Sequence, residues 1–402
     1  MVRVADLITN FQEIYGACPR VYRAPGRVNL IGEHTDYNDG FVMPAALNRF
    51  TWIAVTPRDD RSLVLRSTNY PDVVTADLNN IKLQKNHHWS DYVRGTAAVL
   101  ESMGHRLRGA NLLISGEVPM GAGLSSSAAL EVSAGFTLLD ISGIKIDRMQ
   151  LALACQRAEH EFAGTRCGIM DQFISCFGRA EHALMLDTRS LTYKALPLPQ
   201  QVSVVICNSM VKHDNATGEY NTRRAECETG VRHMGTKNPA IRALRDATLS
   251  DLEKSKSELS DTVYRRCRHV IGENARVLAA ASALVRSDFA EFGHHMYESH
   301  RSLRDDYEVS CRELDVLVEL ASKLRGVYGA RMTGAGFGGC TVNLVRSEQS
   351  AAFQTGIAER YEKAVAIKPE IYVCTAAQGA ERMDSSSFTT SATLAVPRRG
   401  QK

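Results

Sequence analysis

The stretch ISGEVPMGAGLSSSAALEV (residues 114–132) makes the chain change from a strand to a helix within a few residues. The apolar run ends at Val118, and Pro119 cannot continue the hydrogen bonding of a strand. Two glycines then allow a tight turn, and three serines open a helix. These turn and helix-opening residues are Gly121, Gly123, Ser125, Ser126 and Ser127. Any fold of this chain must therefore contain a strand, a glycine loop and a helix in succession.

The backbone N–H groups of such a loop converge with the positive end of the helix dipole, which favours a bound polyphosphate. The loop is not a Walker loop, because no Gly-Lys-Ser/Thr follows, and the GxSxG of a nucleophile elbow is absent. The same unit also occurs as a structural connection with a serine N-cap. The loop alone leaves both interpretations open.

Along the rest of the chain, runs typical of strands are mixed with runs typical of helices without a strict alternation. The predicted strands include residues 20–25, 41–56, 201–209, 331–345 and 370–377. Between about residues 220 and 325 the apolar residues recur at helical spacing instead. This mixture predicts the α+β class.

We expect two closely packed domains, because the sequence shows no repeat and no long linker. The stretch LPLPQQ places their boundary near residue 200, which gives an N-terminal domain over 1–200 and a C-terminal domain over 201–384. The tail, residues 385–402, is small, polar and without periodicity, and we expect it to be disordered.

Composition excludes several classes of protein. Hydrophobic residues make up 44% and charged residues 23% of the 402, as in ordinary soluble proteins. The formal net charge of +3 provides no basic field, so we expect no nucleic acid and no membrane as partner. The N-terminal segment reads as an amphipathic helix, and no apolar stretch could span a bilayer. The ten cysteines lie singly, without zinc spacing, and we expect them to be reduced in the cytosol.

A second stretch, GRVNLIGEHTDYNDG (residues 26–40), crowds five ionisable side chains into a turn-rich segment. They are Arg27, Glu33, His34, Asp36 and Asp39. Such a segment can be an ordinary surface loop, or it can bind a ligand that carries many hydroxyl groups.

A third stretch, RMTGAGFGGCTVNLV (residues 331–345), contains GxGxxG from Gly334 to Gly339. A dinucleotide fingerprint must open a helix, whereas CTVNLV has the β-branched alternation of a strand. Dinucleotide binding is therefore excluded by context. A glycine-rich loop before a strand still allows the backbone to approach a ligand or another loop.

In their order along the chain (residues 26–40, 114–132 and 331–345) and at this spacing, the three stretches resemble the three motifs of the GHMP kinases, which include galacto-, homoserine, mevalonate and phosphomevalonate kinases. RVNLIGEHTDYN is similar to the signature of the galactokinase branch. AEHEFAGTRCGIMDQF, GEYNTRRAEC and SHRSLRDDYEVSCRELD agree with that branch. The resemblance covers roughly residues 18–382.

The resemblance implies a two-domain α+β GHMP kinase fold with the active site between the N- and C-terminal domains. ATP would lie on the VPMGAGLSSSA loop with Mg²⁺, and the sugar on GRVNLIGEHTDYNDG (residues 26–40). The galactokinase branch phosphorylates the anomeric O1 hydroxyl of α-D-galactose, which gives galactose 1-phosphate and ADP in the first step of the Leloir pathway. We therefore expect galactose and ATP as small-molecule partners of a monomer or weak homo-oligomer.

The resemblance also implies roles for individual residues. The implied catalytic residues are Asp171, as the base for the O1 hydroxyl, and Arg27, as a cation beside it. The implied sugar contacts are Glu33, His34, Asp36, Gly168, Asp171 and Tyr220. The implied nucleotide contacts are Gly121, Gly123, Leu124, Ser125, Ser126, Ser127, Ala128 and Trp89. The implied Mg²⁺ ligands are Ser127 and Glu159, whose oxygens suit this ion.

Judged by residue type alone, simpler roles stay open. Asp171 at the start of a helix resembles an N-cap, Glu159 an exposed helix acid, and Trp89 a core residue. Whether Asp171 takes the proton or only orients the hydroxyl is also open. Asn215 departs from the family pattern in the loop before Tyr220, whereas Asp39 has no implied role.

Two other functions compete with galactose phosphorylation. The first is a related sugar-1-kinase that acts on N-acetylgalactosamine, arabinose or galacturonate. The second is a non-catalytic galactose sensor, but such relatives lose the Ser-Ala pair of the phosphate motif. This chain keeps SSSAAL together with Asp171 and Glu159, so we expect it to be an enzyme.

Overall fold

The computed structural model describes residues 4–81, 88–211 and 216–384. The tail at 385–402 and the departure at Asn215 lie outside these residues. The strands form sheets in which almost all neighbours are antiparallel, and the helices are grouped beside these sheets. This arrangement confirms the predicted α+β class. No helix in the described part of the chain is long and apolar enough to cross a membrane.

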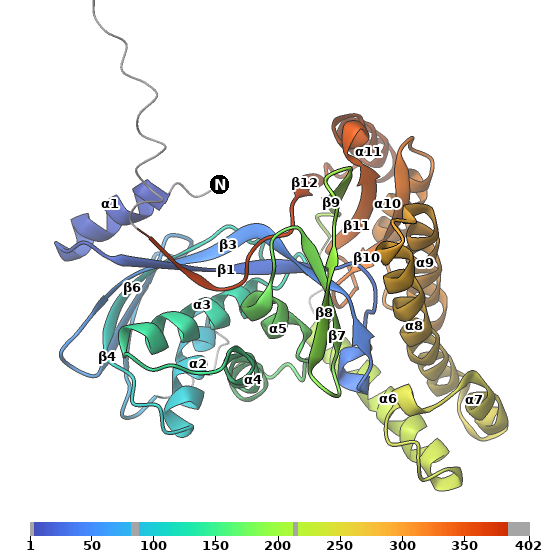
Figure 1. Ribbon diagram of the computed structural model, residues 1–402, viewed down its shortest axis with the longest axis horizontal. Helices are drawn as coiled ribbons and strands as arrows, with labels where there is room; N and C mark the ends of the chain where they lie inside the picture. Colours follow the sequence, from blue (N-terminus) through green and yellow to red (C-terminus); the bar gives the residue numbers. More distant parts are fainter. Residues whose placement is uncertain (1–3, 82–87, 212–215, 385–402) are drawn as a thin grey trace, which may run out of the picture.

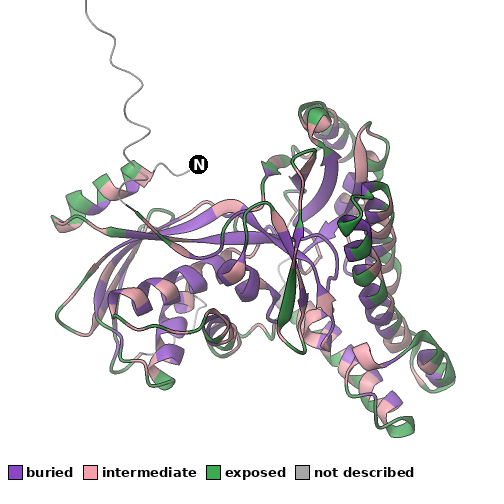
Figure 2. Cartoon of the chain, in the orientation of Figure 1, coloured by how far each residue is buried: buried purple, intermediate pink, exposed green. Residues whose placement is uncertain are grey.

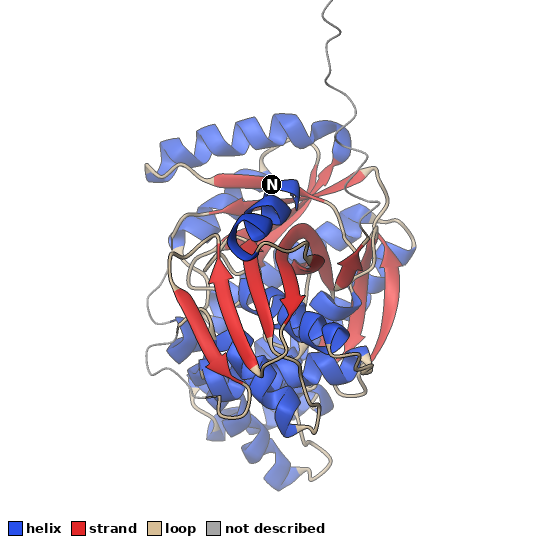
Figure 3. Cartoon of the chain, turned by 90° about the vertical axis from the view of Figure 1, so that its left-hand side faces the viewer, coloured by secondary structure: helices blue, strands red, loops and turns tan. Residues whose placement is uncertain are grey.

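The N-terminal half contains a six-stranded sheet with the order β13-β1-β3-β6-β4-β5. Its strands are β1 (Arg20–Asn29), β3 (Pro44–Pro57), β4 (Ser62–Ser67), β5 (Val73–Asp77), β6 (Ala110–Gly116) and β13 (Glu381–Met383). Neighbouring strands are antiparallel except β4 and β6, which are parallel. Figure 3 shows these strands side by side.

Side chains alternate between the two faces of this sheet, and apolar residues are buried on both faces, except at the edge strand β5, where every second residue is exposed. On one face Val21 and Leu113 pack against Phe11 of α1 (Val4–Tyr15). On the other face Tyr22 and Leu112 join the core of four helices. These helices are α2 (Asp91–Ser102), α3 (Ser126–Ile141), α4 (Arg148–Ala158) and α5 (Met170–Phe177). Figure 1 shows them together on the side of the sheet opposite α1.

The C-terminal half contains a four-stranded antiparallel sheet with the order β10-β11-β9-β12. Its strands are β9 (Val202–Asn208), β10 (Val327–Thr333), β11 (Cys340–Arg346) and β12 (Glu370–Cys374). The helices of this half are α6 (Ala216–Lys237), α7 (Leu249–Ser255), α8 (Asp261–Val285), α9 (Phe289–Ser302), α10 (Arg312–Ser322) and α11 (Ser350–Val365). α10 and α11 share one core with the sheet, and α8 and α9 share another. Figure 2 shows the buried strands of this half between helices with exposed outer surfaces.

The two halves meet in a shared core and a small third sheet. That sheet has the order β2-β7-β8, with β2 (Phe41–Val42), β7 (His182–Asp187) and β8 (Thr192–Pro197). The shared core takes Leu30 from the end of β1, Leu124 from the glycine loop, Ile206 from β9 and Val277 from α8. The first two sequence motifs are therefore fixed by one core. The domain boundary near residue 200 stays a prediction, and β13 returns the chain to the N-terminal sheet.

Three predicted elements differ from the structure. The strand predicted over 41–56 is two strands, β2 and β3, which belong to different sheets. The strand predicted over 331–345 is two strands, β10 and β11, because positive φ angles at Gly334 and Gly336 turn the chain between them. The sequence also predicts one helix over RMQLALACQRAEHEFAG (residues 148–164), but in the structure α4 changes at Glu159 to a π turn, η2 (Glu159–Ala163), which ends at Gly164. Such π turns are frequent at functional sites.

Candidate active site

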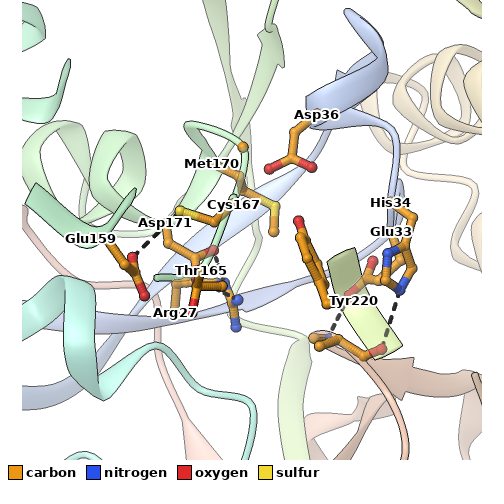
Figure 4. Close-up of a pocket in the computed structure, with 13 residues that line it drawn as sticks. Arg27, Glu33, His34, Asp36, Glu159, Thr165, Cys167, Met170, Asp171 and Tyr220 are labelled. Atoms are coloured by element: carbon orange, nitrogen blue, oxygen red, sulfur yellow. Dashed lines mark hydrogen bonds and ion pairs between the residues drawn. The ribbon is translucent and has the colours of Figure 1, made fainter. Parts of the chain in front are cut away.

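A small polar cavity lies where the end of β1, the turn before α5, the first turns of α6 and the 334–339 loop meet (Figure 4). Its volume is about 160 Å³. The structure brings together all residues predicted to be catalytic or to contact the sugar, and one predicted metal ligand. They are Arg27, Glu33, His34, Asp36, Glu159, Gly168, Asp171 and Tyr220. Several of these residues are more than a hundred positions apart in the sequence, and only the fold makes them neighbours.

Arg27 of β1 and Asp171 of α5 form a bidentate ion pair in this cavity (Figure 4). Nε of Arg27 donates to Oδ1 of Asp171 over 2.7 Å, and Nη2 donates to Oδ2 over 2.8 Å. Burial lowers the pKa of Arg27, but the charge and hydrogen bonds of Asp171 outweigh burial and raise it above its ordinary value. The N-cap of α5 is Ile169, so Asp171 is not a helix cap.

The same ion pair contacts the glycine loop. Nη1 of Arg27 donates to the carbonyl oxygen of Gly123, and the hydroxyl of Ser125 donates to Oδ2 of Asp171. Ser125 lies directly before α3 with a φ of +58°, in the left-handed region. The first N–H groups of α3, which lack partners within the helix, therefore begin beside Asp171.

A second, larger cavity of about 900 Å³ borders this glycine loop. Four of the predicted nucleotide contacts line it, namely Trp89, Gly121, Ser126 and Ser127. The other four, Gly123, Leu124, Ser125 and Ala128, are not among its lining residues. Leu124 and Ala128 are buried, so they shape the loop from behind.

Trp89 is both a core residue and part of the wall of the larger cavity. Its side chain is buried and packs in the core under the N-terminal sheet. Its indole stacks on Tyr70, with ring centroids 5.6 Å apart and planes 3° apart. Its Nε1 donates to Asp72 over 3.1 Å. The two interpretations of this tryptophan are therefore compatible.

The 334–339 loop packs directly on the 121–125 loop. A Cβ atom at Gly334 would lie 2.9 Å from the carbonyl oxygen of Gly123, and one at Gly339 would lie 3.0 Å from that of Ala122. Glycine is therefore required for this approach of two backbones. Of the two possibilities left open by the third stretch, the structure shows contact with another loop.

Glu33 lies at the junction of the two halves, where four donors surround its carboxylate. Nη1 of Arg331 is 2.7 Å from Oε2, and the backbone nitrogen of Gly334 is 2.8 Å from Oε1. Asn29 and Thr333 donate the other two hydrogen bonds. Because Arg331 and Glu33 are both buried, this ion pair connects residues 26–40 to β10 out of contact with solvent.

His34 has a protein partner at each ring nitrogen. Nε2 lies 3.2 Å from the carbonyl oxygen of Ala335, and Nδ1 lies 2.8 Å from the hydroxyl of Tyr37. A carbonyl oxygen only accepts, so Nε2 carries the hydrogen and Nδ1 accepts from Tyr37. Burial and then the nearby His269 hold the pKa of His34 well below its ordinary value. The neutral His34 ring therefore connects the 26–40 segment to the 334–339 loop.

Asp36 and Gly168 occupy adjoining parts of the cavity wall. A Cβ atom at Gly168 would lie 2.0 Å from Oδ2 of Asp36, so this carboxyl group fills the space that glycine leaves. Burial and then the charge of Asp171 raise the pKa of Asp36 to about 6. The ring of Tyr220 lies 5.5 Å from that of His34.

Glu159 is buried at the start of the π turn, which excludes its interpretation as an exposed helix acid. The hydroxyl of Ser127 donates to its Oε1 over 3.2 Å. Burial and then the charge of Asp171 raise the pKa of Glu159 to about 7. The two predicted metal ligands are therefore adjacent, and Glu159 lines the small cavity while Ser127 lines the larger one.

The sequence did not single out five residues that lie outside the cavity wall and hold it in place by hydrogen bonds, directly or through a neighbouring residue. They are Tyr37, Glu131, Gln172, Glu273 and Arg331. Two of them had a signal, because Gln172 follows Asp171 and Glu131 lies one helical turn after Ser127. Arg331 had none, since its partner Glu33 lies 298 positions earlier.

Three family models match the chain. The galactokinase galactose-binding signature matches residues 9–57, the N-terminal domain of GHMP kinases residues 91–179, and their C-terminal domain residues 280–363. Among curated relatives, galactokinase of Roseiflexus sp. (strain RS-1) is 47% identical, over 95% of this chain and 98% of the relative. Galactokinase of Chloroflexus aurantiacus is also 47% identical, over 94% of this chain and 97% of the relative.

Solved structures agree with these matches. Galactokinase of Lactococcus lactis, complexed with galactose, superposes with a TM-score of 0.92 at 35% identity, over 95% of this chain and all of that chain. Mevalonate kinase of Methanococcus jannaschii superposes with a TM-score of 0.63 at 17% identity, over 90% of this chain, and shows the shared fold alone. The ordered motifs, the fold and the relatives thus agree, and the chain belongs to the galactokinases of the GHMP kinase family.

Proposed function

We propose that this chain transfers the γ-phosphoryl group of ATP to the anomeric O1 hydroxyl of α-D-galactose, giving galactose 1-phosphate and ADP. Phosphorylation of galactose follows from membership of the galactokinases. The observation that carries the rest is the position of Asp171, which lines the small cavity and accepts a hydrogen bond from Ser125 of the glycine loop. A sugar in that cavity and a polyphosphate on the loop would meet at this carboxylate.

Asp171 acts as the base in this proposal. Its carboxylate accepts the O1 proton while the oxygen attacks the γ-phosphorus, and ADP leaves with the electrons of the broken P–O bond. Arg27 holds both carboxylate oxygens in place and stabilises the negative charge that develops on the transferred group. The ion pair therefore serves orientation and electrostatics together.

The small cavity binds the sugar, with Glu33, His34, Asp36, Gly168, Asp171 and Tyr220 in its wall. Asp36 is the wall carboxylate best placed to accept sugar hydroxyls, because the carboxylate of Glu33 already has four donors. His34 would contribute its ring, since both nitrogens have protein partners. A site built to hydrogen-bond hydroxyl groups rejects analogues that lack them.

The larger cavity binds the nucleotide. Gly121, Ser126 and Ser127 of the glycine loop lie at its wall, where the free N–H groups at the start of α3 can hold phosphate oxygens. Trp89 lines the same cavity and provides an aromatic wall for the adenine base.

Mg²⁺ fits the pair formed by Ser127 and Glu159. A hydroxyl and a carboxylate are hard oxygen donors of the kind that Mg²⁺ takes, with phosphate and water as its other ligands. No group of three or more His, Cys, Asp or Glu side chains in the described part of the chain could hold a metal by itself. Bound Mg²⁺ supplies neutralisation of the phosphate charge.

We also propose that the protein works in the cytosol as a monomer or weak homo-oligomer. All ten cysteines are free, and most are buried. Free thiols in apolar surroundings are typical of a reducing compartment.

A coupled assay of ADP release tests the proposed function. Purified protein with Mg-ATP is offered galactose, glucose, 2-deoxygalactose, N-acetylgalactosamine, arabinose and galacturonate, and the phosphorylated position is read by NMR. We expect the highest kcat/KM with galactose and a phosphate on O1. Preference for another sugar would identify a related sugar-1-kinase, and galactose binding without turnover would identify a sensor.

Replacing Gly168 by alanine is expected to raise KM for galactose by at least tenfold. The new methyl group would overlap the carboxyl of Asp36, whose displacement removes a sugar contact worth about 1.5 kcal/mol or more. Initial rates over a range of galactose concentrations measure the effect. Gly356→Ala is the control, because its Cβ would meet only the flexible end of Leu324, at 3.1 Å. An unchanged KM in Gly168→Ala would contradict a sugar site beside Asp36.

Galactose binding is expected to weaken as the pH falls through about 6. The folded protein holds the pKa of Asp36 near 6, so its carboxylate is present above this pH and is protonated below it. If the ionised form accepts sugar hydroxyls, the Kd for galactose rises by up to tenfold for each pH unit below 6. Calorimetry without nucleotide between pH 5 and 8 measures this slope. Asp36→Asn should bind weakly at every pH, and a slope that persists in that variant would assign the titration to another group.

A further inference from the structure

Gln172 lies in the core directly after Asp171 and bridges two buried carboxylates. Its Nε2 is 2.5 Å from Oε2 of Glu159 and 3.0 Å from Oε2 of Glu131. A side-chain amide nitrogen carries two hydrogens, and here each points to a carboxylate. In this orientation both amide hydrogens have acceptors, whereas Oε1 of Gln172 has no hydrogen-bond partner among the described residues.

Glu131 makes one hydrogen bond among the described residues, which it accepts from Gln172. It lies on α3 one helical turn after Ser127, with none of its side chain exposed. Among the described residues, its Oε2 accepts from Gln172 and its Oε1 has no hydrogen-bond partner. A buried carboxyl group with an unpartnered oxygen is costly, and an apolar side chain would be cheaper at this position. Stability alone therefore does not explain this glutamate.

The amide of Gln172 divides the two oxygens of Glu159 between two tasks. Oε2 accepts from Gln172 over 2.5 Å and from the thiol of Cys167 over 3.5 Å, whereas Oε1 accepts from Ser127 of the glycine loop. Hydrogen bonds of this kind hold a metal ligand in the geometry that the metal needs. We infer that Gln172, held in turn by Glu131, is a positioning residue that directs one oxygen of Glu159 towards Mg²⁺ beside Ser127. This inference rests on the proposed function, in which Ser127 and Glu159 bind the metal.

Gln172→Met tests the inference, because methionine matches the length of glutamine but lacks the amide. The probe is Mn²⁺, and the amount bound to the protein in the presence of ADP is read from the electron paramagnetic resonance signal of free Mn²⁺. We expect Mn²⁺ to bind 10–100-fold more weakly to the variant. Galactose binding, measured by calorimetry without metal or nucleotide, should stay within about twofold of the wild type. A purely structural defect would not separate these two measurements.

Two substitutions of Glu131 extend the test, and they apply even if Gln172→Met does not fold. Glu131→Gln keeps an oxygen that can accept from Gln172 and should stay within about threefold of wild-type Mn²⁺ affinity. Glu131→Leu removes that acceptor and should weaken Mn²⁺ binding at least fivefold. If Glu131 acts through Gln172, Mn²⁺ must bind more tightly to Glu131→Gln than to Glu131→Leu.

Gln156→Met is the matched control. Gln156 donates to the carbonyl oxygen of Cys167 over 3.2 Å, and His160 holds the same oxygen over 2.8 Å. This variant should bind Mn²⁺ within twofold of the wild type. Unchanged Mn²⁺ affinity in Gln172→Met, or equal losses for Mn²⁺ and galactose, would overturn the inference alone. Wild-type protein that binds galactose but no Mn²⁺ with ADP would overturn the proposed metal site and, with it, the inference.

Discussion

Replacing Asp171 by asparagine is expected to lower kcat by about 10²–10⁴-fold while galactose still binds. The amide has the size of the carboxyl group, but it cannot take the O1 proton. In the wild type, Arg27 donates to both oxygens of Asp171, so in the variant one of these donors faces an NH₂ group or loses its partner. Steady-state kinetics give kcat, and calorimetry gives the Kd for galactose.

The same substitution separates a base from a group that only orients the hydroxyl. An asparagine oxygen still accepts a hydrogen bond, so a residue that only orients O1 would keep most of its rate in this form. Asp39→Asn is the control from the same motif, because Asp39 is half-exposed and its ion pair with Arg189 is of the weak surface kind. A kcat for Asp171→Asn within tenfold of the wild type would contradict the assignment of Asp171 as the base.

Replacing Arg331 by methionine is expected to lower the free energy of unfolding by about 3–5 kcal/mol. The Arg331 side chain is 0% exposed and that of Glu33 is 2% exposed. Nη1 of Arg331 donates to Glu33 over 2.7 Å and to the carbonyl oxygen of Asn29 over 3.1 Å. Its removal leaves a buried carboxylate without its cation at the junction of the two halves. Urea denaturation followed by fluorescence measures the loss.

A double substitution identifies the cause of that loss. Glu33→Gln in the Arg331→Met background removes the unpaired charge and should recover part of the stability. Arg157→Met is the control, since Arg157 and Glu161 form an exposed helix pair with 50% and 46% of their side chains accessible. Such pairs contribute about 0.5 kcal/mol. A loss below about 1 kcal/mol for Arg331→Met would show that the buried pair does not hold the junction.

Much of the wall of the small cavity could be predicted from the sequence, because its residues lie close together in one motif. Arg27, Glu33, His34 and Asp36 fall within ten residues, and so many ionisable groups in a turn are unusual enough to mark a site. The order of the three motifs along the chain (residues 26–40, 114–132 and 331–345) then identified the family. The exact partners of these groups could not be predicted, because they come from other motifs.

His34 and Glu33 illustrate what local sequence leaves out. The motif places an imidazole and a carboxylate in a turn, but their partners Ala335 and Arg331 come from the opposite half of the chain. His34 and Glu33 can bind a ligand with all their polar atoms only if Ala335 and Arg331 do not reach them. The packing of β10 against the end of β1 decides this.

Glu159 shows the same limit for burial. Helical spacing places it on α4 or just beyond, and residue type favours exposure. In the structure Glu159 is the first residue of the π turn at Glu159–Ala163, and contacts with Ser127 and Gln172 enclose its carboxylate. Residue type alone indicated an exposed acid, whereas the family resemblance implied a metal ligand, and burial of the side chain excludes the first of these.

The sequence by itself determined the strand, glycine loop and helix at 114–132, the α+β class and, through the family resemblance, eight of the residues that line the small cavity. These depend on local backbone preferences, on side-chain periodicity and on motif order, all of which are written along the chain. Only the tertiary structure decided that the 334–339 loop packs on the 121–125 loop and that Asp171 contacts both Arg27 and Ser125. Such contacts join residues far apart in sequence, and they form because the shared core of the two halves brings the loops together.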